Sequence, residues 1–307
     1  MAETCGQQLR VGFIGAGEMA SALLDGLLST GKVEPERIVV TNRSSDERLT
    51  RARQTWGVRT TRKKRDLLET DLIVLAVKPA DAATALTELR QAAEQAADRT
   101  AKQHATSMVA LPGSRPVLLS LAAGVPTSAV EQLLGARWPV VRAMPNTSSR
   151  ILESATALTA GSHASPADVE LAATILATVG PVVEVAEEML NAVTGLSGSG
   201  PAYVYLMVEG MIAAGVRAGL ETAVARQLAV QTVFGAARML KESGADPAEL
   251  RRQVSSPNGT TVAALSLLQE ADWPGILGDA VQRAVTRAQE LGRLSAAAVD
   301  SSVSGIG

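Results

Sequence analysis

The stretch Val11-Gly12-Phe13-Ile14-Gly15-Ala16-Gly17-Glu18-Met19-Ala20 joins a short apolar run to the pattern G-x-G-x-x-A. The run predicts a strand, and the residues after the glycines predict the first turn of an amphipathic helix. Gly15 permits a tight turn, Gly17 lets the backbone approach a pyrophosphate, and Ala20 allows close packing of helix on strand. A strand, a glycine turn and a helix in this order predict a dinucleotide site, whereas the bare pattern would also fit a structural turn.

Outward from this stretch, the first half of the chain alternates β-branched apolar runs with helical stretches. This alternation is typical of a doubly wound α/β sheet, and near-continuous apolar runs such as Leu72–Val77 suit parallel strands buried on both faces. The predicted strands are Val11–Ile14, Ile38–Thr41, Leu72–Val77, Val117–Leu121, Val140–Ala143, Thr156–Thr159 and Val182–Val185. The predicted helices of this half are Met19–Ser29, Ala82–Ala97, Ser128–Leu134 and Pro166–Thr178.

From Glu187 onward the pattern changes, because no convincing strand remains and apolar residues recur at helical spacing. The sequence predicts a dinucleotide-binding domain over residues 1–186 and an all-helical domain over residues 187–307. Two segments, Gln91–Ser114 and Ser295–Gly307, are expected to be mobile. The predicted helices of the second domain are Tyr203–Arg217, Ala223–Leu240, Thr261–Leu268 and Ala280–Leu291.

Composition and charge argue against several classes of protein. A formal net charge of −2 offers no basic excess for nucleic acid, and no run approaches the roughly 18 apolar residues of a membrane span. The segment Met1–Arg10 is too polar for a signal peptide, and the one cysteine, Cys5, cannot form an internal disulfide, which favours a cytoplasmic location. His104 and His163 have no metal-ligand partner at useful spacing, so neither a metal site nor a Ser-His-Asp hydrolase is expected.

The helical half carries small residues that let helix backbones approach closely. Because the chain has little aromatic bulk, such a domain can gain much of its core from a second copy of itself. A homodimer is therefore favoured, and a compact bundle within one chain is the alternative. The small residues of one helical stretch are Gly210, Ala213, Ala214, Gly215, Ala218 and Gly219.

The residues after the second strand favour NADPH over NADH as the cofactor. A site that prefers NADH usually has Asp or Glu here, to accept from the ribose 2′-hydroxyl. This chain instead has Asn42, Arg43 and two serines, and a guanidinium and hydroxyls suit a 2′-phosphate. The basic run Arg62–Arg65 either lies beside the same end of the cofactor or forms a solvated face.

Two further strand ends are expected to border the cofactor, since ligands bind at the carboxyl edge of such sheets. Ala76-Val77-Lys78-Pro79 follows the strong apolar strand, and Leu121-Ala122-Ala123-Gly124 ends the next one with small residues. Each string is weak evidence alone, but two consecutive strand ends in one sheet support each other.

The helical half contains two loops with possible roles in ligand binding. The string Thr194–Ala202 is too rich in glycine for an undisturbed helix, which indicates either a close ligand or a plain interhelical turn. The segment Ser255–Thr261 leads straight into a helix, where backbone N–H groups and hydroxyls form a cradle for a carboxylate. Simple N-capping by Ser256 or Thr260 would explain the same residues.

Five motifs in order resemble the pyrroline-5-carboxylate reductase family over roughly residues 10 to 293. They are Phe13–Gly17, Leu75–Pro79, Ala143-Met144-Pro145-Asn146-Thr147, Leu196–Tyr203 and Ser255–Thr261. The resemblance implies an N-terminal Rossmann-type domain and an all-α dimerisation domain, in homodimers that can assemble up to decamers. It implies a reaction in which NADPH, or NADH, reduces 1-pyrroline-5-carboxylate to L-proline by hydride transfer to the imine carbon.

The resemblance also implies the site residues. The implied substrate-binding residues are Glu187, Ser256, Thr260 and Thr261, and Thr261 is in addition expected to orient the substrate for catalysis. The implied cofactor-binding residues are Ile14, Gly15, Ala16, Gly17, Glu18, Met19, Asn42, Arg43, Ala76, Val77, Lys78, Pro79, Ala122, Ala123 and Gln253.

The chain departs from the family pattern at three places. A family asparagine near the adenosine aligns with Lys63 or Lys64, Asn258 replaces the first glycine of a Gly-Gly pair, and Ser148 replaces a proline.

Two other functions compete with this one. A β-hydroxyacid dehydrogenase would need a catalytic lysine on the first helix of the second domain, and Glu187–Leu206 contains none. A non-catalytic dinucleotide sensor would bind NADPH without turnover.

Overall fold

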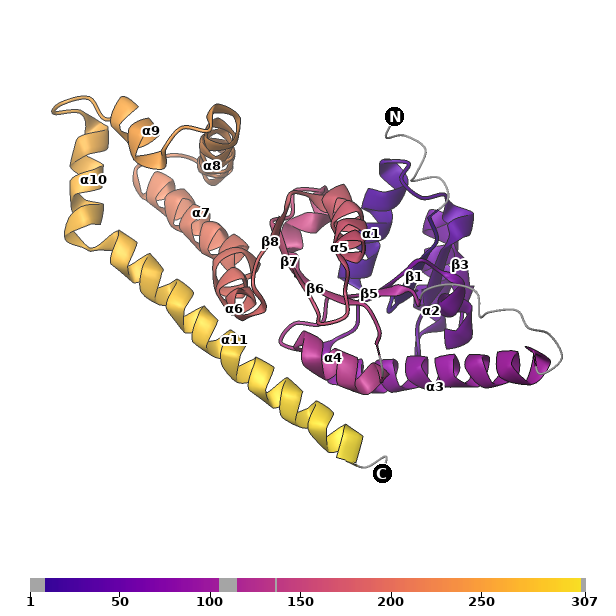
Figure 1. Ribbon diagram of the computed structural model, residues 1–307. Coiled ribbons are helices and arrows are strands. Elements are labelled where there is room, and N and C mark those ends of the chain that lie inside the picture. Colours follow the sequence, from indigo (N-terminus) through magenta and orange to yellow (C-terminus); the bar gives the residue numbers. More distant parts are fainter. Residues whose placement is uncertain (1–8, 105–114, 136, 305–307) are drawn as a thin grey trace. The chain divides into compact units, whose positions relative to one another are not determined.

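The computed structural model describes residues 9–104, 115–135 and 137–304. They form two compact units, one holding residues up to Gly198 and from Val285 onward, the other Ser199–Ala284 (Figure 1). The predicted boundary at residue 186 marks the change from a mixed α/β pattern to helices alone. The two units above are defined by compactness instead, so their limits differ from that boundary. Cys5 lies outside the described residues, as do residues 105–114 and 305–307 of the segments predicted to be mobile.

The first unit is built on an eight-stranded sheet with the order β3-β2-β1-β4-β5-β6-β7-β8. Neighbouring strands are parallel except β6 and β7. Strand β1 lies between β2 and β4, so successive connections leave it in opposite directions and open a crevice at its carboxyl end. The strands are β1 Val11–Ile14, β2 Ile38–Thr41, β3 Arg59–Thr61, β4 Leu72–Leu75, β5 Val117–Ser120, β6 Val140–Met144, β7 Thr156–Ala160 and β8 Val182–Glu184.

The seven predicted strands are thereby confirmed, with ends that differ by no more than two residues. The antiparallel β7 departs from an all-parallel sheet. Its connection from β6 contains only a short 3₁₀ helix, Thr147–Ile151, whereas a parallel neighbour needs a longer crossover that is usually an α-helix.

Helices cover both faces of this sheet (Figure 1). Consecutive strand residues point to opposite faces. Phe13 packs with α1 and α5 in one buried cluster, and Ile14 packs with α3 and α4 in the other. The helices of this unit that follow strands are α1 Glu18–Ser29, α2 Asp46–Trp56, α3 Pro79–His104, α4 Thr127–Leu134 and α5 Pro166–Leu176. Short 3₁₀ helices lie at Pro35–Arg37, Lys64–Glu69, Ala177–Val179 and Glu187–Met189.

The structure of this unit differs from the sequence prediction at three places. Helix α2 and strand β3 were not predicted, because α2 buries only Leu49 and Ala52 and β3 buries no residue. Gln91–His104 is helical and belongs to α3. A helical assignment does not test mobility, so the expectation that this stretch is mobile stays a prediction.

After β8, the described chain is helical throughout, as expected. The helices are α6 Leu190–Val193, a π-helical turn Thr194–Gly198, α7 Gly200–Arg217, α8 Thr222–Ser243, α9 Pro247–Gln253, α10 Thr260–Glu270 and α11 Trp273–Ser304. Helix α9 was not predicted, and residues 295–304 are helical.

The helices of the second unit leave much apolar surface exposed. No residue of α7 is buried, and α8 buries only Ala225 and Ala229. Leu206, Leu228 and Phe234 are each more than half exposed. A compact bundle within one chain would bury such side chains, so the alternative of an ordinary intrachain core is not what the structure has. In the described part of the chain, no helix is long and apolar enough to span a bilayer.

Candidate functional site

The glycine turn at the end of β1 is fixed by its neighbours on both sides. The amide of Gly15 donates to the carbonyl oxygen of Thr41 (2.8 Å), and the amide of Ala76 donates to that of Ile14 (2.9 Å). Gly15 has a φ of +106°, and a Cβ added to it would lie 2.4 Å from the carbonyl oxygen of Ala76. Only glycine fits at position 15, because the positive φ disfavours any residue with a side chain and the backbone of Ala76 leaves no space for a Cβ.

Gly17 differs from Gly15, because its surroundings are open. It is the N-cap of α1, no side chain caps the helix, and a Cβ added to Gly17 would meet no atom within 4 Å. The uncapped amides at the start of α1 carry the positive end of the helix dipole, as a pyrophosphate site requires. Glu18, the first residue of α1, pairs with Arg150 (3.3 Å), which offsets its negative charge beside such a site.

A cavity of about 740 Å³ lies at this edge of the sheet. Its size falls within the range of ligand-binding pockets, and the open helix terminus that it contains fits a dinucleotide. Most of the predicted cofactor residues line it: Ile14, Gly15, Ala16, Gly17, Glu18, Met19, Asn42, Arg43, Ala76, Val77 and Lys78.

Four predicted cofactor residues are placed elsewhere. Pro79 begins α3, Ala122 is buried in the core under α3 and α4, and Ala123 is exposed. Leu121, just before them, lines the cavity instead. Gln253 ends α9 in the second unit.

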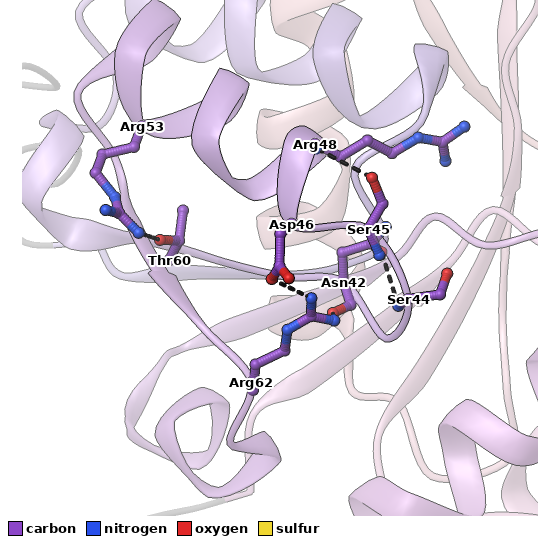
Figure 2. Close-up of polar contacts among 8 residues, drawn as sticks. All are labelled: Asn42, Ser44, Ser45, Asp46, Arg48, Arg53, Thr60 and Arg62. Atoms are coloured by element: carbon purple, nitrogen blue, oxygen red, sulfur yellow. Dashed lines mark hydrogen bonds and ion pairs between the residues drawn. The ribbon is translucent and has the colours of Figure 1, made fainter.

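The loop after β2 is held in one conformation by its own polar groups (Figure 2). The side-chain oxygen of Asn42 accepts from the amides of Ser44 (3.1 Å) and Ser45 (2.9 Å). The hydroxyl of Ser45 accepts from the amide of Arg48 (3.2 Å) and so caps α2. Arg62 donates to the carbonyl oxygen of Asn42 and pairs with Asp46. The loop that carries Arg43 is therefore ordered by contacts within the chain.

Four cations line this cavity, Arg43, Arg48, Lys64 and Lys78, and two of them form ion pairs with carboxylates of α3. Arg43 pairs with Asp81 (3.2 Å), and Lys64 pairs with Glu88 (3.5 Å). Burial lowers the pKa of the Lys64 ammonium and the charge of Arg43 lowers it further, outweighing Glu88, which acts to raise it. Within the basic run Arg62–Arg65, only Lys64 is among the residues that line this cavity.

Glu187 lies where the helical segments begin, and its carboxylate is bound by groups of the sheet unit. It accepts from the amide (2.8 Å) and the hydroxyl (2.6 Å) of Thr127 and from Arg142 (2.9 Å). Burial acts to raise the pKa of Glu187, but these hydrogen bonds and the charge of Arg142 outweigh it and leave the pKa below its usual value. These contacts favour a positioning role, and the predicted contact with substrate stays a prediction.

Asn146 connects the Met-Pro-Asn-Thr motif to the glycine-rich string. Its side-chain amide donates to the carbonyl oxygen of Ser197 (3.0 Å), and its side-chain oxygen accepts from the amide of Ser148 (3.1 Å). A proline at 148 has no N–H to donate, so Ser148 adds a hydrogen bond. The string forms a π-helical turn, which is frequent at functional sites, and not a plain interhelical loop.

The predicted substrate loop lies in the second unit. Gly259 is the N-cap of α10, and no side chain caps this helix, so capping by Ser256 or Thr260 does not explain the motif. Thr260 and Thr261 are the first two residues of α10 and stand at its positive end. Asn258 has a φ of +57°, a conformation that asparagine tolerates better than most residues, and this explains how it replaces a glycine.

In the ranges that the structure describes, no group of three or more His, Cys, Asp or Glu side chains could hold a metal ion.

The mainly parallel sheet, the glycine turn at the end of β1 and the cavity beside it define a dinucleotide-binding protein of the Rossmann type, followed by a helical domain. A family model described as pyrroline-5-carboxylate reductase dimerisation matches residues 187–291. A second, described as NADP oxidoreductase coenzyme F420-dependent, matches residues 10–98.

Curated relatives and solved structures are similar to this chain over nearly its whole length. Pyrroline-5-carboxylate reductase 2 of Bacillus subtilis is 36% identical over 283 residues, covering 92% of this chain and 95% of the relative. The structure of a pyrroline-5-carboxylate reductase from Coxiella burnetii matches with a TM-score of 0.81 and 37% identity, covering 92% of this chain and 98% of that one. The Plasmodium falciparum enzyme with NADP bound matches with a TM-score of 0.76 and 25% identity, covering 93% and 99%. The chain belongs to the pyrroline-5-carboxylate reductase family.

Proposed function

We propose that this protein reduces 1-pyrroline-5-carboxylate to L-proline, the final step of proline biosynthesis, with NADPH as the preferred reductant. The observation that carries the proposal is the cavity at the carboxyl edge of the sheet, lined by the glycine turn and Arg43, in a chain of this family.

The proposed reaction needs little acid–base catalysis by side chains of the protein. When bound, the reduced dinucleotide supplies the hydride that the imine carbon accepts. A protonated cyclic imine is already strongly electrophilic, which agrees with the absence of histidine from the motifs. The protein's own contribution is therefore mainly to hold the reacting groups in place and exclude water.

Within the sheet unit, the proposed cofactor contacts follow the cavity. The amides at the start of α1 hold the pyrophosphate, and Ala76 to Lys78 border the rest of the cofactor. Arg43 binds the 2′-phosphate by charge-assisted hydrogen bonds, which favours NADPH over NADH. Pro79, Ala122, Ala123 and Gln253 are further proposed contacts that rest on the family resemblance.

For the substrate, the proposed contacts are at the start of α10. Its positive end and the hydroxyls of Ser256, Thr260 and Thr261 suit a carboxylate. Thr261 hydrogen-bonds the ring nitrogen or the carboxylate and orients the substrate for hydride transfer.

The proposed organisation follows the two kinds of secondary structure. Residues 1–186 bind the dinucleotide, and residues 187–307 bind substrate and form a homodimer, which can assemble further, up to decamers. The exposed apolar side chains of α7 and α8 support this assembly. We place the protein in the cytoplasm, with neither nucleic acid nor membrane as a partner.

The proposal is tested by mixing the purified protein with NADPH and 1-pyrroline-5-carboxylate. We expect NADPH oxidation that depends on the substrate and yields proline in equal amount. NADPH binding without turnover would indicate a dinucleotide sensor, and oxidation with a β-hydroxyacid-derived substrate in its place would indicate a dehydrogenase of another family.

A further inference from the structure

Lys64 lines the cavity together with three other cations, Arg43, Arg48 and Lys78. It begins the 3₁₀ helix Lys64–Glu69 that follows β3, and its side chain is only 10% exposed. It lines the same cavity as Arg43, Ser44 and Ser45. Its neighbour Lys63 is exposed and is not among the lining residues.

Two of these cations already have a carboxylate partner on α3. Arg43 pairs with Asp81, and Lys64 pairs with Glu88. Asp81 and Glu88 are seven residues apart, about two helical turns, and so lie on the same side of α3. Two of the cations that line the cavity, from different segments of the chain, are thus paired with two carboxylates of one helix.

This arrangement is suited to exchange of partners with an anion. Asp81 and Arg43 are each about half exposed, and an ion pair of that kind contributes little to stability. The Lys64 ammonium is less well solvated and lies within electrostatic reach of Arg43. A doubly charged phosphate contacting both cations would therefore relieve their repulsion while retaining their charges.

We propose that Lys64, together with Arg43, binds the 2′-phosphate of NADPH and that the pair sets the selectivity for NADPH over NADH. With NADH, which lacks this phosphate, the two cations keep their partners Asp81 and Glu88. The inference rests on the proposed function, because it assigns a role within the same cofactor site.

The test compares dissociation constants of NADPH and NADH for the full-length protein and Lys64→Met, which keeps the length of the side chain but removes its charge. We expect the dissociation constant of NADPH to rise about tenfold or more, as for loss of a charge-assisted contact, and that of NADH to change less than twofold. Lys64→Arg should retain most of the NADPH affinity, and Lys63→Met should change neither constant. An equal loss for both cofactors, or no loss, would overturn the proposal.

A second measurement uses the unaltered protein, in case Lys64→Met does not fold. Acetylation of Lys64 by acetic anhydride is followed by mass spectrometry with adenosine 2′,5′-bisphosphate or with 5′-AMP. We expect protection by the 2′-phosphorylated compound and none by 5′-AMP at matched occupancy of the site, and equal protection by both would contradict the assignment. If the unaltered protein binds neither NADPH nor NADH, the proposed function itself fails; if it turns over NADPH but shows no such discrimination, only the role of Lys64 fails.

Discussion

The carboxylate of Glu187 accepts hydrogen bonds from both the backbone amide and the hydroxyl of Thr127, the first residue of α4. The N-cap of this helix, Pro126, has no side chain that could cap it. A residue 60 positions away in the sequence therefore supplies the negative charge that the helix N-terminus favours. Through this contact Glu187, at the start of the helical segments, holds Thr127 in place at the end of the loop that contains Leu121 and Gly124.

Glu187→Gln should destabilise the protein at neutral pH, by about 1–2 kcal/mol, because hydrogen bonds to a charged group are lost. The pKa of Glu187 is lowered in the folded state, so its contribution is complete above the ordinary carboxyl pKa and is lost as the pH falls through the lowered value. Urea unfolding at a series of pH values should therefore show the difference between the two proteins narrowing in acid.

The exposed neighbour Glu188 provides the control, because Glu188→Gln should leave the unfolding free energy almost unchanged. A difference that does not depend on pH would contradict the role of the charge. Unchanged stability with a higher KM for pyrroline-5-carboxylate alone would instead support direct contact of Glu187 with substrate.

Substitution of the two turn glycines should separate folding from cofactor binding. In Gly15→Ala the new methyl group collides with the backbone at Ala76, so we expect a lower melting temperature and loss of NADPH binding. In Gly17→Ala the methyl group meets no protein atom, so the melting temperature should be nearly unchanged while NADPH binding weakens at least tenfold. If Gly17→Ala binds NADPH normally, the pyrophosphate does not lie at this helix terminus.

Arg43→Ala should weaken NADPH binding by about ten- to a hundredfold, the effect of losing a charge-assisted contact, and should weaken NADH binding much less. Arg53→Ala is the matched control, because Arg53 donates to the hydroxyl of Thr60 (2.8 Å; Figure 2) and is not among the lining residues. Fluorescence titration with each cofactor measures both constants. Equal losses for the two cofactors would argue against a contact with the 2′-phosphate.

Thr261→Ala should lower kcat/KM for pyrroline-5-carboxylate by roughly tenfold or more, because a substrate contact that orients the reacting carbon is lost. The dissociation constant of NADPH should not change. Thr261→Ser keeps the hydroxyl and should recover most of the activity. An unchanged kcat/KM in Thr261→Ala would show that this hydroxyl does not act on the substrate.

Buried elements were predictable from the sequence, and polar ones were not. Strands such as Leu72–Leu75 are buried along their whole length, so an apolar run marks each of them. Helix α2 exposes most of its surface, yet Ser45 before it and the left-handed Gly57 after it are boundary signals that could have located it. Asp246 and Pro247 mark the start of α9 in the same way.

The glycine turn and Arg43 were predictable because their chemistry is contained in short stretches. The contacts of Lys64 and Glu187 were not predictable, because each is made with a partner distant in sequence. Nothing local connects Lys64 to Glu88, or Glu187 to Thr127; the fold brings these pairs together. For Lys64 the available signals were the basic run Arg62–Arg65 and the alignment of Lys63 or Lys64 with a family asparagine, and neither distinguished the exposed Lys63 from Lys64 in the cavity.

The most direct test of the central claim follows the hydride itself. The protein is incubated with 1-pyrroline-5-carboxylate and NADPH carrying deuterium at the transferable position of the nicotinamide, and the proline formed is analysed by mass spectrometry and NMR. We predict one deuterium per proline, on the ring carbon that is bonded to nitrogen and does not carry the carboxylate. Proline without deuterium, or no proline while NADPH remains bound, would contradict the assignment of this protein as a pyrroline-5-carboxylate reductase.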